Sequence, residues 1–185
     1  MSTLATGAAL TPETFADFVA RLQHDVEGEG VKHHYTADAI FIVQARVEVA
    51  GIDRDYTDKL LVFVDESTWY SPQEYWDDLD EHGRESLDRK AVEEEGASFL
   101  GLDVPSQWDI LDDLPDHTVT GWDERWEYVS AHMTKDAADA FVKRKGHDYR
   151  KGLRVYVESQ CYSWEYNAII NALMRGDLVL KGQQA

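Results

Sequence analysis

The order of the predicted elements indicates an α+β fold, in which helices flank a mainly antiparallel sheet and an acidic helical lobe lies beside it. The length of 185 residues fits a single domain, residues 1–185. Hydrophobic residues make up 43% of the chain and aromatic residues 11%, which is typical of a protein with a packed core. We therefore expect an ordered domain despite the formal net charge of -18.

The N-terminal part of the chain predicts one helix and two strands. Residues 1–10 are expected to be a frayed leader, and a helix begins after the capping residue Thr11. Residues 38–50 alternate apolar and polar side chains, as a strand does, and residues 60–64 form a second apolar run. Together these two runs predict an antiparallel hairpin.

The acidic lobe is predicted at about residues 65–127, and three helices are expected within it. A capping-box pattern at Ser71 begins the first helix, and residues 84–95 are expected to be helical again after Gly83. A short third helix is capped by Ser106 and ended before Pro115.

The last third of the chain predicts an alternation of strands and helices. Residues 124–132 and 153–160 are expected to be strands, and residues 135–145 and 164–174 are expected to be helices. Residues 178–180 are expected to add an edge strand. The elements of this part would complete the sheet and cover it.

The negative charge is concentrated in residues 65–127, which contain 20 Asp and Glu but only four Lys and Arg. A dense carboxylate surface repels nucleic acid and attracts proteins that normally bind it. We therefore expect a basic, nucleic-acid-binding protein as partner, with no direct binding to nucleic acid and no membrane association. A basic cluster near the C-terminus is interpreted as a complement to the acids or to a helix dipole: Lys143, Arg144, Lys145, Arg150, Lys151 and Arg154.

The candidate partner-binding residues are carboxylates of the acidic lobe. They are Asp77, Asp78, Asp80, Glu81, Glu85, Asp88, Glu93, Glu94, Glu95, Asp109, Asp112 and Asp113. In one continuous helix, four of them would form a stripe with neighbours about 5–6 Å apart, whereas a break at Gly83 would divide the stripe. The alternative interpretation is a solvated acidic surface without a specific partner.

Five of the six tryptophans also lie in the acidic lobe. The sequence favours burial for most of them, because a polyanionic segment needs apolar side chains to stay folded. The alternative is that they anchor an interface with a charged rim.

Signatures of catalysis, of metal binding and of cofactor binding are absent from the sequence, so neither a cofactor nor a metal ion is expected. The least implausible catalytic residues are His147, Asp148, Tyr149 and Cys161, which would have to converge in a pocket. Because Cys161 is the only cysteine, an intramolecular disulfide is impossible and a reducing, cytoplasmic location is expected.

Three runs in the C-terminal part, residues 134–141, 147–149 and 155–159, resemble a group of small phage and prophage proteins of uncharacterised function. The resemblance implies a strand, a Thr-capped helix, a basic turn and a second strand. It also implies an origin in a mobile element, and by analogy a role against host defence of the anti-CRISPR kind.

Charge and resemblance together predict an inhibitor that mimics double-stranded DNA. It would occupy the basic groove of a host defence complex, such as a CRISPR surveillance complex or a restriction enzyme. The alternative prediction is a non-enzymatic adaptor that binds a protein through an aromatic surface.

Overall fold

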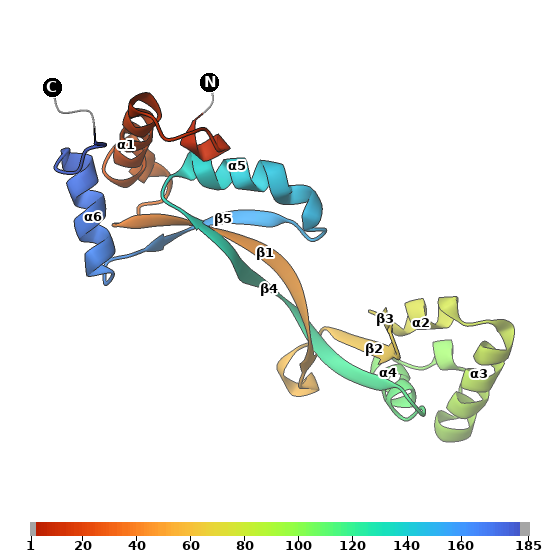
Figure 1. Ribbon diagram of the computed structural model, residues 1–185. Coiled ribbons are helices and arrows are strands. Elements are labelled where there is room, and N and C mark those ends of the chain that lie inside the picture. The colour runs from red at the N-terminus through yellow and green to blue at the C-terminus, as the bar shows by residue number, and fades with distance from the viewer. Residues whose placement is uncertain (1–2, 182–185) are drawn as a thin grey trace. The chain divides into compact units, whose positions relative to one another are not determined.

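The computed structural model describes residues 3–181 and confirms the predicted α+β class (Figure 1). In that range the helices are α1 (Pro12–Val26), α2 (Pro72–Asp78), α3 (Glu81–Glu95), α4 (Val104–Asp112), α5 (Lys135–Lys145) and α6 (Trp164–Arg175). The strands are β1 (Ala39–Ile52), β2 (Leu60–Val64), β3 (Ser67–Trp69), β4 (Thr118–His132) and β5 (Leu153–Ser159). None of the helices in residues 3–181 has the length and apolar character that crossing a membrane requires.

The five strands form one sheet in the order β3-β2-β4-β1-β5. The pairs β1–β5, β2–β3 and β2–β4 are antiparallel. The predicted hairpin of β1 with β2 is wrong, because β4 lies between them. Gly121 of β4 allows a close approach there: a Cβ atom on it would lie 2.7 Å from the carbonyl oxygen of Ile52, at the end of β1.

The chain divides into two compact units, and the division separates the charge. Glu48–Arg125, which we call the acidic unit, contains 23 Asp and Glu and six Lys and Arg, a net charge of -17. Met1–Val47 with Trp126–Ala185, which we call the neutral unit, contains 13 acids and 12 bases, a net charge of -1. The acidic unit contains nearly all of the lobe predicted at residues 65–127.

In the part of the neutral unit that the structure describes, buried side chains form two clusters. In the first, Ala138 of α5 packs with Phe41 and Val43 of β1, and α5 lies over β5 in Figure 1. In the second, Leu22 of α1 packs with Ile170 of α6. These clusters fix the helices of the unit against the sheet and against each other.

The N-terminus of α5 is capped from a distant part of the chain. Thr134 precedes the helix, but its hydroxyl accepts a hydrogen bond from Arg21 and does not cap the helix. The buried carboxylate of Asp25 instead accepts a hydrogen bond from the amide of Lys135 at 2.8 Å. A carboxylate at this helix end also complements the helix dipole.

The acidic unit has a single large core on one face of its strands. Val62 of β2 and Val119 of β4 pack there with helical residues such as Leu87 and Leu111. The ring of Trp76 stacks on Phe99, with 5.8 Å between the ring centroids. The apolar side chains that hold this highly charged unit together therefore come from both strands and helices.

The helices of the acidic unit begin and end differently from the prediction. The break between α2 and α3 falls at Leu79, whose backbone is extended, and Gly83 lies inside the first turn of α3. The carboxylate of Asp80 caps α3 by accepting a hydrogen bond from the amide of Gly83 at 2.7 Å. Helix α4 begins earlier than predicted, and Asp103 caps it in place of Ser106.

Two predictions at the ends of the chain are wrong. Leu4–Thr6 form a short 3-10 helix close to α5, so residues 3–10 are not a structureless leader, while residues 1–2 lie outside the described range. Residues 178–180 do not form a strand. The strand that was predicted at residues 124–132 is longer than expected, because β4 begins at Thr118.

Candidate functional site

The twelve predicted carboxylates all lie in the acidic unit, and every one except Asp88 is exposed. Within residues 3–181, seven of them accept hydrogen bonds or form ion pairs: Asp77, Asp78, Asp80, Asp88, Glu94, Asp109 and Asp112. In the same range, five have neither a hydrogen bond nor an ion pair: Glu81, Glu85, Glu93, Glu95 and Asp113. The second group is available to a partner without breaking any internal contact.

Three of the engaged carboxylates support the fold of the acidic unit through the backbone. Asp80 caps α3, as described above. Asp88 accepts a hydrogen bond from the amide of buried Phe99 at 2.8 Å, and Asp112 accepts one from the amide of Val119 at 2.9 Å. These acids hold the loop after α3 and the start of β4, so their roles are structural.

Ion pairs in the acidic unit are formed with its own few bases. Arg54 contacts Asp109 at 2.8 Å and Asp112 at 3.4 Å, and Lys90 contacts Glu94 at 2.5 Å. Exposed pairs of this kind are weak in water. They leave most of the negative charge of the unit uncompensated.

The basic cluster of the C-terminal part has partners inside the neutral unit. Lys145 pairs with Asp148 at 2.8 Å, and the hydrogen bond from Lys145 lowers the pKa of that carboxyl. The guanidinium of Arg154 lies 4.3 Å from the ring centroid of Trp126 and donates to the side chain of Gln44. The predicted dipole role is consistent with Lys143–Lys145, which form the last turn of α5.

The predicted four-residue stripe of acids does not form. Asp77 belongs to α2, and the carboxylate of Asp88 is held by Phe99, so only Glu81 and Glu85 remain as an exposed pair on α3. The break at Leu79 is the physical reason, because it separates the two helical surfaces.

Among the free acids of α3, Glu85 and Glu93 lie on its outward side, whereas Glu95 lies nearer to the buried side, although it is exposed at the end of the helix. At 100° per residue, Glu85 and Glu93 point away from the direction of buried Leu87 and Ala91, and Glu81 lies beside Glu85. Arg89 lies on the same side, between Glu85 and Glu93, and its guanidinium donates to the hydroxyl of Ser86. This side of α3 therefore presents carboxylates that have no ion pair within residues 3–181, together with one arginine.

The C-terminal end of α3 is unfavourable for the helix itself. Glu93, Glu94 and Glu95 occupy its last turn, which contains no basic residue. Acids at this end oppose the helix dipole at about 0.3–1 kcal/mol each. Their placement therefore weakens the helix, although Glu94 is paired with Lys90 in the preceding turn.

A shallow hollow of about 410 Å³ brings two of the predicted acids together beside an indole. It is lined by Trp69, Glu74, Asp77 and Asp78. The indole nitrogen of half-buried Trp69 donates to Asp78 at 3.2 Å, which holds the carboxylate at the rim. The hollow adds an apolar contact to the acidic surface.

Sequence reasoning missed three acids that surround a second hollow in the acidic unit, namely Glu48, Asp65 and Glu66. Glu48 lies outside the segment that was predicted to be acidic. The sequence does contain a signal for this hollow. Every side chain of residues 60–64, the strand β2, is apolar, so the strand has an apolar face on each side of the sheet and only one of them can face the core.

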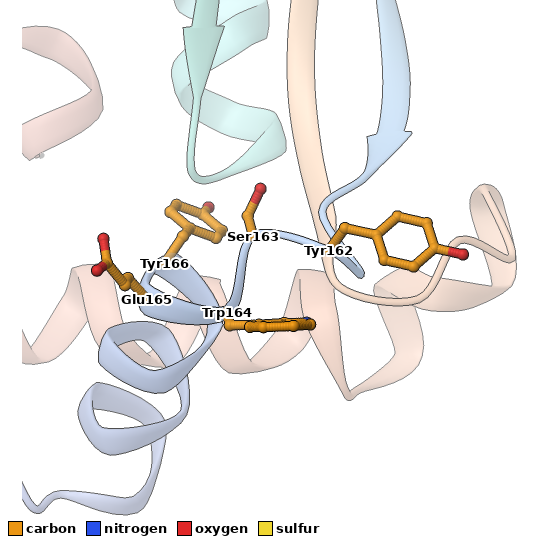
Figure 2. A pocket seen from close by; sticks show the side chains of 5 residues that line it. All are labelled: Tyr162, Ser163, Trp164, Glu165 and Tyr166. Carbon is orange, nitrogen blue, oxygen red and sulfur yellow. The ribbon is translucent and has the colours of Figure 1, made fainter.

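The tryptophans follow the prediction only in part. Trp108 is buried, whereas Trp69, Trp76, Trp122 and Trp126 are half-buried. Several aromatic side chains are far more exposed than these, one of them Tyr56 of the acidic unit, which is 83% exposed. Figure 2 shows Tyr162 and Trp164 beside a hollow of about 460 Å³ at the start of α6, and they are 88% and 78% exposed.

The predicted catalytic candidates are not brought together. His147 and Asp148 precede β5 and Cys161 follows it, so the seven-residue strand places them about 20 Å apart. Within residues 3–181, no group of three or more His, Cys, Asp and Glu side chains is placed to hold a metal ion. The arrangement that these residues would need for catalysis is therefore not present.

No family model, curated protein or solved structure matches this chain. Fold and site define an α+β protein in which nearly all of the net negative charge lies in one of two units.

Proposed function

We propose that this chain is a non-enzymatic inhibitor whose acidic unit occupies the DNA-binding groove of a basic nucleic-acid-binding protein. The observation that carries the proposal is the segregation of charge, with -17 in the acidic unit and -1 in the neutral unit. Such a field steers the acidic unit toward cationic grooves and away from nucleic acid.

The exposure of the carboxylates and their lack of internal partners support the proposal. Five candidate acids are exposed and have no partner within residues 3–181, so they can meet Lys and Arg side chains directly. The last turn of α3 keeps three acids in positions that weaken the helix. A partner that supplies positive charge would remove this penalty on binding.

A host defence complex is the proposed target, either a CRISPR surveillance complex or a restriction enzyme. Both classes hold duplex DNA in a groove lined by basic residues, which a protein with the charge of DNA can block. The resemblance of residues 134–141, 147–149 and 155–159 to phage and prophage proteins supports this choice of target.

The test is affinity capture from a bacterial lysate with three forms of the full chain. The first is the wild type, and the second carries Glu85→Lys, Glu93→Lys and Glu95→Lys. The control carries Glu27→Lys, Glu158→Lys and Asp177→Lys, which are exposed positions of the neutral unit with the same total change in charge. Reversal of Glu93 and Glu95 in the last turn of α3 favours the helix dipole, and a urea denaturation curve of each variant shows that loss of capture is not loss of folding.

The wild type and the control are expected to retain a DNA-binding protein at about 50 mM salt and to release it at about 200 mM salt or with added duplex DNA. The α3 variant is expected to retain much less of it. Equal retention by all three forms, or retention that duplex DNA does not change, would refute the proposal.

A protein adaptor is the second candidate function, because Tyr162 and Trp164, which only Ser163 separates in the sequence, are both exposed at the start of α6 (Figure 2). Tyr and Trp are enriched among the residues that dominate protein interfaces. In this case Trp164→Ala would abolish capture of the partner, whereas the α3 variant and salt would have little effect.

A further inference from the structure

A hollow of about 330 Å³ lies on the acidic unit, on the opposite face of β2 from the core. Its lining comes from β1, β2, and the β2–β3 hairpin with the residue that follows it: Glu48, Ala50, Leu61, Phe63, Asp65, Glu66, Thr68 and Tyr70. The volume is near the lower limit of small-ligand pockets and suits one long side chain.

The alternation of β2 explains why this face is apolar and open. Val62 points into the core with the helices, whereas Leu61 and Phe63 point to the other face. Phe63 pairs in register with Thr68 of β3, and both are exposed. Buried Leu61 forms the floor, and Phe63, 37% exposed, forms one wall.

Tyr70 also lines the hollow and is held in place by three contacts. Its hydroxyl donates to the carboxylate of Glu48 at 2.6 Å, and its amide donates to the carboxylate of Glu74 at 2.8 Å. Its ring packs edge to face with that of Trp122, at 5.1 Å between centroids. The position of the ring and the position of the Glu48 carboxylate are therefore fixed before any ligand binds.

Carboxylates surround this aromatic hollow. Glu48 lies beside Tyr70, and Asp65 and Glu66 occupy the turn between β2 and β3. Asp65 has a positive φ of 52°, a conformation that Asp and Asn tolerate better than most residues. A hollow lined by two aromatic rings and three acids has the chemistry that binds a flat organic cation.

We propose that this hollow receives one arginine side chain of the basic partner. The guanidinium would stack between Phe63 and Tyr70 and donate hydrogen bonds to the rim carboxylates, with its aliphatic stem over Leu61. Arginine suits the site better than lysine, because its planar fork both stacks and bonds to two oxygens. The inference rests on the proposed function, since it assigns an anchor to the same interface.

The test uses the isolated full chain and small probes, so no partner is needed. N-acetyl-arginine amide is titrated into isotopically labelled protein, and the backbone amide shifts of Leu61, Phe63, Thr68 and Tyr70 are followed by NMR. N-acetyl-lysine amide and the uncharged N-acetyl-citrulline amide are the matched probes. We expect saturable shifts at the hollow with arginine, weaker binding of lysine, and no saturable shifts with citrulline.

Two conservative variants separate binding at the hollow from attraction to the whole acidic unit. Phe63→Leu keeps an apolar side chain but removes the ring, and is expected to weaken arginine binding by about two- to five-fold. Asp65→Asn keeps the turn geometry but removes a negative charge, so it is also expected to weaken arginine binding. Asp116→Asn is the control, because Asp116 is an exposed acid of the same unit that does not line the hollow, and it should leave arginine binding unchanged.

Arginine-induced shifts that spread evenly over α3, or equal binding of citrulline, would refute the assignment. The two proposals fail separately. If the hollow binds arginine but the wild type captures no DNA-binding protein, the proposed function is refuted. If the wild type captures a DNA-binding protein that duplex DNA displaces but the hollow does not bind arginine, only the proposal of an arginine anchor is refuted.

Discussion

At the scale of single residues, acids that look alike in the sequence have two different roles. Asp88 and Glu85 lie three positions apart on α3, yet the Asp88 carboxylate holds the amide of Phe99 and the Glu85 carboxylate is free within residues 3–181. The sequence predicted both as partner-binding residues. It could not separate them, because the contact of Asp88 depends on a loop that returns eleven residues later.

The structural role of Asp88 can be tested by stability. Asp88→Ala leaves the amide of fully buried Phe99 without an acceptor, so the free energy of unfolding should fall by about 1–3 kcal/mol. Glu85→Ala should leave it within about 0.5 kcal/mol of the wild-type value. Urea denaturation of the two variants measures the difference, and equal values would show that the contact with Phe99 is unimportant.

His132 makes the stability of the chain depend on pH. Burial, and to a lesser degree the charge of Arg144, lower its pKa from the ordinary 6.5. Below about pH 6.5 the unfolded chain therefore binds the proton more readily than the folded chain, and stability falls as the pH decreases through this window.

His132→Gln should remove this part of the pH dependence while retaining a polar side chain beside the Ser130 hydroxyl, which lies 2.9 Å from the imidazole. The measurement is the free energy of unfolding at about pH 7.5 and about pH 5 for both proteins. We expect the wild type to lose more stability than the variant over this interval. Identical losses would exclude His132 as the cause.

At the scale of elements, local signals predicted the helices well and the sheet poorly. The caps at Thr11 and Ser71 and the glycine at Gly176 mark helix ends that the structure confirms. The pairing of β1 with β2 was predicted from their proximity in the sequence, but β4 lies between them. Pairing depends on contacts between distant residues, such as Gly121 with Ile52, which a local pattern does not contain.

Helix α3 provides a test of the conflict between stability and binding. Glu95→Lys places a base in the last turn, so the free energy of unfolding should rise by about 0.3–1 kcal/mol while capture of the basic partner weakens. As a control of opposite sign, Glu13→Lys in the first turn of α1 should lower stability. A Glu95→Lys protein that is less stable than the wild type would contradict this account of α3.

At the scale of the whole molecule, the charge distribution was evident in the sequence but the division into units was not. The boundaries fall at Val47–Glu48 within β1 and at Arg125–Trp126 within β4, where no linker composition marks them. The acidic unit therefore extends beyond the predicted segment and includes Glu48, which contributes to the hollow at Tyr70. Which acids remain unpaired also depends on tertiary contacts.

The salt dependence of binding to the captured partner tests the central claim most directly. The dissociation constant would be measured from about 50 to 200 mM salt for the wild type, the α3 triple variant and the neutral-unit control. We predict a steep loss of affinity for the wild type and the control, and a clearly smaller slope for the α3 variant, because fewer charges meet the partner. Equal slopes for all three proteins would contradict the proposal that the acidic unit forms the interface.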